Sequence, residues 1–320
     1  MRVGLVDVDS HRFPNLPLMK ISAWHKAQGD TVEFASPLEH YDIAYVSKIF
    51  GSEYSPDYGF RLDADRIITG GTGYAIAVEN GREVFHRDRH SVLPYEIEHI
   101  YPDYLLYPEL TRDRAYGFLT RGCPNGCPWC IVSQSEGRKT VKVADVSEWW
   151  NGQRNICLMD ANILACPDRL ALLDQLAATR ARVNFCQGLD ARQISDEVCE
   201  HLAPVRREKV HFAYDRMDAG AKIEKGLELA RDKLGLTKDR TSVYILTNYD
   251  TTLEEDLYRI AKVEEIGLHP DVRIYRKESL PRRHILRDLQ RWCNNRFIHA
   301  LTNFENYAPR GKTMKEEYNI

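Results

Sequence analysis

The sequence predicts an α/β protein in which a small Rossmann-like or flavodoxin-like sheet precedes an incomplete (β/α)6 barrel. From residue 115 onward, apolar strand-like runs alternate with charged, helical segments. Successive runs begin 27 to 40 residues apart, which is enough chain for one strand and one helix each. Six such units fit into the remaining length and eight do not, so we expect an open barrel.

The N-terminal part has the pattern of a parallel sheet. A helix is predicted over residues 18–27, ending at Gly29. Strand-like runs lie at residues 3–8, 31–34, 43–46 and 66–69. The segment 90–114 is rich in Pro and Tyr and has no clear period, so we expect a connection there. The predicted division is an α/β domain over 1–110, a barrel over 111–280 and a C-terminal helix and tail over 281–320.

The predicted barrel strands are followed by loops at which functional groups are expected, because the C-terminal face of such barrels carries their sites. The strand-like runs are 115–120, 155–160, 182–187, 209–214, 241–247 and 271–275. Near the C-terminus, apolar residues recur at helical spacing and should pack on the barrel. These residues are Ile285, Leu289, Trp292, Phe297, Leu301 and Phe304. The tail over 308–320 is expected to be mobile.

Composition is that of an ordinary globular protein. The 320 residues are 43% hydrophobic and 28% charged, and the mean hydropathy is −0.47. No apolar run approaches the roughly 18 residues that a membrane helix needs, and the N-terminus lacks a signal-peptide pattern. We therefore predict a cytoplasmic protein with no membrane partner. The net charge of −3 does not demand a nucleic-acid partner.

One basic stretch keeps a nucleic-acid partner open. Arg283, Arg287 and Arg291 lie four residues apart and so share a helix face. The ridge would suit an acidic partner or nucleic acid, and a solvated basic face is the alternative.

Three of the eight cysteines lie close together. Cys123, Cys127 and Cys130 have the spacing C-x-x-x-C-x-x-C in a segment rich in Pro and Gly, directly after the first barrel strand. Three thiolates can ligate three irons of a cubane cluster and leave the fourth iron open for a second cofactor. The alternative is zinc, which requires a fourth donor nearby. The preceding histidines, His86, His90 and His99, lack the spacing of a zinc finger.

The cysteine loop resembles the signature of the radical S-adenosylmethionine (SAM) superfamily, which has this spacing after its first barrel strand. The resemblance implies that Cys123, Cys127 and Cys130 hold a [4Fe-4S] cluster whose fourth iron chelates SAM. It further implies that an electron breaks a carbon–sulfur bond of SAM, and that the resulting 5′-deoxyadenosyl radical removes hydrogen from a substrate that the sequence does not identify. The expected reductant is a flavodoxin or ferredoxin. Trp129 has the position that family members use beside the adenine.

The resemblance also implies cofactor-binding roles for residues that follow the later strands. Asp160 and Asn162 stand where the family often has Gly-Gly-Glu to hold the methionine amino group of SAM. Gln187, Asp190 and Arg192 follow the third strand and are predicted to reach ribose or carboxylate, and an Asp–Arg pair that closes the turn is the alternative. Two polar residues at the same expected face, Asp215 and Asn248, are either cofactor-binding groups or turn residues.

The N-terminal unit is similar to cobalamin-binding domains in two segments. His11 and Pro14 lie in a degraded form of the Asp-x-His-x-x-Gly motif, and the glycine-rich segment 70–74 resembles the loop that approaches the cobalamin tail. Because Pro14 replaces the expected Gly, cobalamin is the less favoured cofactor. If cobalamin does bind, the protein would be a cobalamin-dependent radical SAM methyltransferase, which is one alternative function. A non-catalytic metal-cluster module that binds nucleic acid is the other.

Two further side chains are candidate donors of a hydrogen atom to a product radical. Cys186 and Tyr214 lie on the third and fourth strands, and core packing is the favoured interpretation for both.

Overall fold

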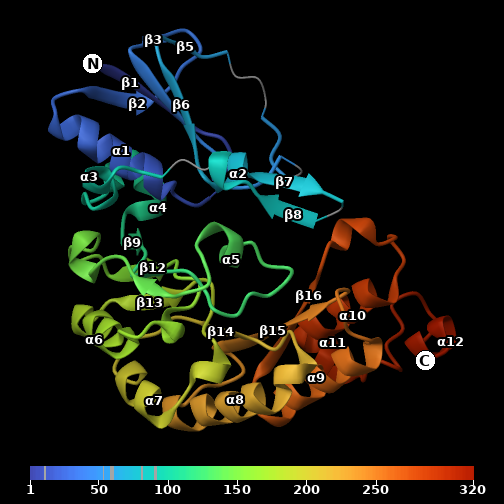
Figure 1. Ribbon diagram of the computed structural model, residues 1–320. Helices are drawn as coiled ribbons and strands as arrows, with labels where there is room; N and C mark the ends of the chain where they lie inside the picture. The colour runs from blue at the N-terminus through green and yellow to red at the C-terminus, as the bar shows by residue number, and fades with distance from the viewer. Residues whose placement is uncertain (11, 53, 58–60, 81, 90–91) are drawn as a thin grey trace. The chain divides into compact units, whose positions relative to one another are not determined.

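The computed structural model describes residues 1–10, 12–52, 54–57, 61–80, 82–89 and 92–320 (Figure 1). The chain divides into two compact units, Met1–Val183 and Asn184–Ile320. This division is based on how the chain packs, whereas the predicted domain boundaries at residues 110 and 280 are based on the order of strands and helices along the sequence. The predicted boundaries stay predictions. No helix among the described residues is both long and apolar enough to cross a membrane.

The first unit begins with a parallel four-stranded sheet in the order β2-β1-β4-β6 (Figure 1). Its strands are β1 (Arg2–Asp7), β2 (Thr31–Phe34), β4 (Ile43–Ser47) and β6 (Ile67–Gly70). Helix α1 (Leu16–Ala27) begins two residues earlier than predicted, because the Asn15 side chain caps it by accepting a 3.2 Å hydrogen bond from Leu18 N. The predicted strands and helix are confirmed.

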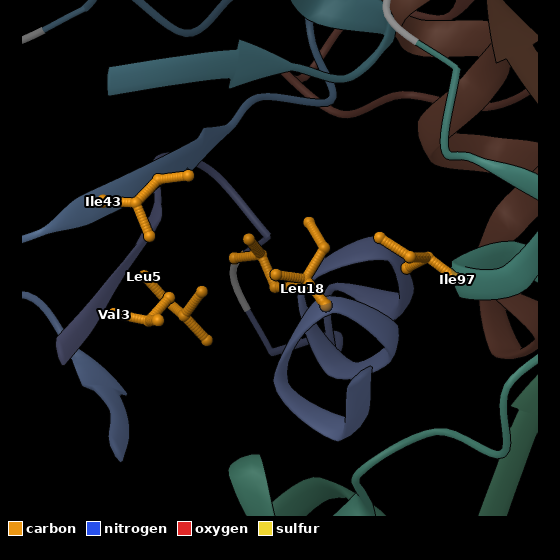
Figure 2. Packing of buried hydrophobic residues seen from close by; sticks show 6 residues of the cluster. Val3, Leu5, Leu18, Ile43 and Ile97 are labelled. Carbon is orange, nitrogen blue, oxygen red and sulfur yellow. The ribbon is translucent and has the colours of Figure 1, made fainter. Parts of the chain in front are cut away.

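The core of this sheet lies between its strands and two helices. Val3 and Leu5 of β1 and Ile43 of β4 pack with Leu18 of α1, and Ile97 of α3 (Tyr95–Glu98) completes the cluster (Figure 2). Burying each of these side chains contributes about 1.5 to 3 kcal/mol relative to leaving it exposed. The segment predicted as an irregular connection thus supplies part of the core.

Several short elements complete the N-terminal part of the first unit. They are β3 (His40–Tyr41), β5 (Asp63–Ala64), α2 (Thr72–Ala75), β7 (Ile76–Glu79), β8 (Arg82–Phe85) and α4 (Pro108–Thr111). Strands β3 and β5 pair in parallel, and β7 and β8 form an antiparallel pair.

The second sheet of the chain has the order β13-β12-β9. Its strands are β9 (Arg114–Gly117), β12 (Asn155–Leu158) and β13 (Arg182–Phe185). Strands β9 and β12 are parallel, with Tyr116 opposite Cys157. The segments between them form β10 (Thr120–Arg121), α5 (Val132–Ser135), β11 (Val141–Lys142) and α6 (Arg169–Thr179).

The second unit has a parallel sheet in the order β14-β15-β16. Its elements before residue 275 are α7 (Asp196–Leu202), β14 (Val210–Ala213), α8 (Gly220–Leu234), β15 (Thr241–Thr247), α9 (Leu253–Glu265) and β16 (His269–Ile274). All six predicted strand positions are therefore strands, and the α/β alternation is confirmed. The hydrogen-bonded sheets found are β13-β12-β9 and β14-β15-β16, so the single barrel stays a prediction.

The C-terminal region differs from the expected continuous helix. It forms α10 (Ile285–Asn294), α11 (Arg296–Leu301) and α12 (Met314–Tyr318). The break lies at Asn295, whose backbone is extended and whose side chain caps α11. Leu289, Trp292 and Phe304 are buried as predicted.

The break also reverses the expected burial of two residues. Phe297 and Leu301 are 83% and 85% exposed, because α11 does not continue the apolar face of α10. The tail expected to be mobile is packed as well, since Met314 is fully buried and Arg310 forms ion pairs with Asp288 and Glu317.

Candidate functional site

The cysteine loop leaves the carboxyl end of β9 and is closed at its base by a two-stranded ladder. Strand β10 pairs with β11 in antiparallel fashion, with Thr120 opposite Lys142. Further into the loop, Cys123 N donates a 3.1 Å hydrogen bond to Gly137 O. The segment that carries the three cysteines is thus a closed hairpin loop in which α5 is the only helix.

Two glycines allow the tight turns of this loop. Gly122 and Gly126 have φ angles of +90° and +57°, which favour glycine. A Cβ atom on Gly122 would lie 2.1 Å from Lys139 O, so the two sides of the hairpin approach closely there. The positions that the sequence marks as turns are therefore required by the fold of the loop.

An acidic side chain fixes the base of the loop. Glu136 accepts hydrogen bonds from Arg121 Nη1 at 2.8 Å and from Gly122 N at 2.9 Å. The hydroxyl of Thr140 donates to Gly122 O at 3.1 Å. These contacts hold the chain on both sides of Cys123.

The three loop cysteines differ in exposure from most others. Cys123, Cys127 and Cys130 are all partly exposed. Four of the remaining five are buried, namely Cys157, Cys166, Cys199 and Cys293. Burial raises the pKa of Cys166, Cys199 and Cys293, which keeps these thiols protonated and unreactive. The loop cysteines are thus accessible together, and of the other five only Cys186 is partly exposed.

Asp160, predicted as a cofactor-binding residue, joins β12 to the start of the loop. Its carboxylate accepts bonds of 2.8 Å from Leu119 N and from Thr120 N, and one of 2.6 Å from Thr120 Oγ1. Burial raises the pKa of Asp160 to about 7, against the opposing effect of these donors. The structure therefore gives this carboxyl a positioning role, and a bond to the amino group of SAM would compete with these three donors.

Asn162 contacts a cysteine directly. Its Nδ2 lies 3.7 Å from Cys123 Sγ and donates to it. Asn162 is also buried, at 3% exposure. Trp129 is partly exposed on the loop itself. The first unit thus brings together Cys123 and Asn162 among the predicted residues.

Cubane clusters and single metal ions require different arrangements of donors. Among the described residues, no group of three or more His, Cys, Asp or Glu side chains is gathered about one metal position. A cubane distributes its three cysteines over three irons, whereas a zinc site gathers four donors around one ion. The donor chemistry of the loop, three accessible thiols with an amide N–H directed at one of them, fits an iron–sulfur cluster.

The histidines considered as a fourth zinc donor have other partners. His86 Nε2 lies 2.9 Å from Glu79, and His99 Nδ1 lies 2.6 Å from Glu148. His90 lies outside the described residues.

The predicted residues after the third strand belong to the second unit. Arg192 and Asp190 form a bidentate pair, with Nε and Nη2 at 2.8 and 3.0 Å from the two carboxylate oxygens. The Asp190 side chain also accepts from Arg192 N, so the pair closes the turn, as the alternative interpretation had it. Gln187 is exposed just before this turn. Cofactor binding by these three residues stays a prediction.

Asp215 and Asn248 link neighbouring strand ends in the same unit. Asp215 accepts a 2.9 Å bond from Leu246 N, and burial raises the pKa of its carboxyl to about 6. Asn248, in a left-handed conformation with φ +66°, donates from Nδ2 to Tyr275 O at 2.8 Å. Both follow the carboxyl ends of parallel strands, and cofactor binding by either stays a prediction.

A buried ion pair beneath these strand ends was not predicted. Arg259 is fully buried, pairs with Asp256, and donates 2.8 and 2.9 Å bonds to Tyr214 O and Leu246 O. Both charged residues share the face of α9 that carries the buried Val263. Charges spaced three apart on an apolar helix face were the signal in the sequence.

The two candidate hydrogen-atom donors differ in burial. Tyr214 is fully buried and donates from its hydroxyl to Glu224 at 2.6 Å, which fits core packing. Cys186 is partly exposed.

The segments similar to cobalamin domains contact their own chain. His11 lies outside the described residues. Asp9 accepts 2.8 Å bonds from Ile49 N and Phe50 N, which makes it the link between two strand ends. Cβ atoms on Gly71 and Gly73 would lie 2.2 Å from Lys48 O and 2.4 Å from Phe50 O. These glycines therefore serve the close approach of the chain over 48–50, which gives cobalamin no support.

No protein-family model matches the chain, and no curated protein matches it. The function is therefore inferred from the geometry of the cysteine loop.

Proposed function

We propose that this protein is a radical SAM enzyme that abstracts a hydrogen atom from its substrate. Cys123, Cys127 and Cys130 would hold a [4Fe-4S] cluster, and SAM would bind beside it. The observation that carries the proposal is that these cysteines are partly exposed on one closed loop, while four of the other five are buried. When bound, the cluster would supply the electron that cleaves SAM to methionine and a 5′-deoxyadenosyl radical.

The neighbouring residues have defined tasks in this proposal. Glu136 and Thr140 fix the base of the loop, so that the thiolates do not have to be ordered when the cluster binds. Asp160 holds Thr120 and with it the start of the loop. Asn162 donates an N–H to the sulfur of Cys123, which stabilises negative charge on that ligand.

The finer features of the proposal come from the resemblance. They are a (β/α)6 barrel built from the six strands, Trp129 beside the adenine of SAM, a flavodoxin or ferredoxin as electron donor and a cytoplasmic location. The eight cysteines, all among the described residues, form no disulfide, which suits a reducing compartment.

The decisive experiment is anaerobic reconstitution with iron and sulfide, followed by dithionite and SAM. We expect close to four irons per chain and release of 5′-deoxyadenosine. Replacing Cys127→Ala should abolish 5′-deoxyadenosine formation and lower the bound iron, because one ligand is lost. The matched control is Cys199→Ala in α7, which removes a buried thiol far from the loop in sequence and should retain both.

Two results would refute the proposal. One is a protein that carries about one zinc per chain after oxygen-free purification and takes up no iron. The other is a reconstituted cluster that yields no 5′-deoxyadenosine under strong reduction, with or without candidate substrates.

A further inference from the structure

An open basic groove in the second unit is lined by residues of α10 and α11. The two helices are labelled in Figure 1. Its volume is about 760 Å³. Its cationic lining residues are Lys277, Arg282, Arg287, Arg291, Arg296 and Arg310. The lining includes a single carboxylate among the described residues, that of Asp288. In a protein whose net charge is −3, such a concentration of positive charge favours an anionic ligand.

Three of these arginines keep their charge available. Within the described part of the chain, no salt bridge engages Arg282, Arg287 or Arg291. Arg287 donates from Nη2 to Lys277 O and Leu280 O, which fixes its side chain, and its buried Nε has no hydrogen-bond partner there. These cations are thus presented in the groove without a salt bridge, because the one nearby carboxylate that Arg291 senses, Asp288, is held by Arg310.

The other charges of the groove are engaged. Arg310 is held by Asp288 and Glu317, and Arg296 pairs with Asp239 at 2.9 Å. These pairs build the walls of the groove and leave its binding charge to Arg282, Arg287 and Arg291, with Lys277, which donates to the neutral amide of Gln290, beside them.

The amide side chains of the groove are also occupied. Gln290 donates to Val272 O at 2.9 Å and accepts from Lys277. Asn294 donates to Asp271 and Val272 O, and accepts from Val272 N. Because these amide groups already form hydrogen bonds within the protein, they are not available to distinguish one ligand from another.

An aromatic ring stands in the same groove. Phe297 lines it and is 83% exposed, although burying a phenylalanine side chain would stabilise the folded protein. Its exposure follows from the cap at Asn295, which turns α11 away from the apolar face of α10. An exposed ring beside cations is the combination by which proteins stack bases while holding phosphates.

We propose that this groove binds single-stranded nucleic acid, with Arg282, Arg287 and Arg291 on phosphates and Phe297 stacked on a base. Guanidinium groups match phosphate geometry, and the occupied amides imply that binding tolerates any sequence. An acidic peptide would satisfy the arginines but would have no base to stack on Phe297. The inference goes beyond the proposed function and does not depend on the cluster.

Binding is tested with the full-length protein and fluorescein-labelled oligonucleotides of dT and rU, about 20 nucleotides long, by fluorescence anisotropy. We expect saturable binding of single strands and weaker binding of the duplex, whose bases are not accessible to Phe297. The logarithm of the affinity should fall with the logarithm of salt with a slope of about −2, since each neutralised phosphate contributes about −0.7. The dT and rU arms distinguish DNA from RNA as the preferred strand.

Matched variants separate specific contacts from overall charge. The double variant Arg282→Gln/Arg291→Gln should weaken binding roughly tenfold or more and make the salt slope shallower. Lys222→Gln/Lys225→Gln removes the same charge from the exposed face of α8 and should leave binding nearly unchanged. Phe297→Leu should weaken binding roughly fivefold or more through lost stacking, and Phe297→Trp should retain it.

Three outcomes would overturn the inference. They are no anisotropy change with tens of micromolar protein at low salt, equal losses in the two double variants, and polyglutamate that displaces the oligonucleotide as well as unlabelled dT does. The last result would assign the groove to an acidic peptide.

Discussion

The carboxylate of Asp160 accepts two hydrogen bonds from Thr120, at 2.8 Å from the backbone N and at 2.6 Å from Oγ1. Asp160 follows β12, and Thr120 begins β10 just after β9, the parallel neighbour of β12, with Cys123 three residues beyond Thr120. The orientation of the cysteine loop thus depends on a buried acid whose pKa is raised to about 7.

The raised pKa of Asp160 predicts a pH-dependent contribution to stability. Its unfolded pKa is near 3.8, so between about pH 4 and pH 7 the folded state holds a proton that the unfolded state has released. The contribution is complete below pH 4 and is lost as the pH rises through 7. The free energy of unfolding of the wild type, measured by urea denaturation relative to Asp160→Asn, should therefore fall between pH 5 and pH 8. A difference that is constant over this range would contradict the raised pKa.

A second prediction concerns the amide of Asn162 and the sulfur of Cys123. Hydrogen bonds to cluster sulfurs stabilise the reduced, more negative state. Replacing Asn162→Ala should therefore shift the reduction potential of the reconstituted cluster to more negative values, measured by EPR-monitored titration. Asn155→Ala, at the start of β12, the strand that precedes Asn162, is the control and should leave the potential unchanged. A shift to positive potential in Asn162→Ala would show that the amide does not act on the ligand.

A third prediction uses two glycines of the cysteine loop. Gly122 and Gly137 have similar φ angles of +90° and +98°, so alanine strains the backbone at both. Only at Gly122 would the new Cβ meet the backbone, at 2.1 Å from Lys139 O, because nothing lies within 4 Å at Gly137. Gly122→Ala should therefore retain much less iron after reconstitution than Gly137→Ala. Equal iron content in both variants would mean that the close approach does not shape the site.

The sequence predicted the elements better than their packing. All six strand positions after residue 114 were found, because apolar runs between turn residues reflect local physics. The break at Asn295 was missed, since an apolar period continues across it and only the cap of α11 reveals it. Local patterns therefore identified the elements, while the burial of Phe297 depended on a single capping side chain.

For the candidate site, too, the sequence predicted the position of the segment but not the contacts of its side chains. The cysteine spacing located the loop, but the partners of Asp160, Asp190 and Asp215 depend on which strands are neighbours. Each of these acids forms hydrogen bonds to the backbone or side chain of a strand end or turn, a role that no spacing in the sequence distinguishes from ligand binding. Tertiary proximity, and not residue type, decides between the two.

The last prediction concerns the buried pair of Arg259 and Asp256, both of which are inaccessible to solvent. Removing one partner of a buried ion pair leaves an uncompensated charge and typically costs about 3 to 5 kcal/mol. Arg259→Met should lower the free energy of unfolding by about that amount, because Tyr214 O and Leu246 O lose their donors as well. The double variant Arg259→Met/Asp256→Leu should be less destabilised than the sum of the two single variants, since no charge is then left buried. Strict additivity in urea denaturation would mean that the two charges do not interact in the folded protein.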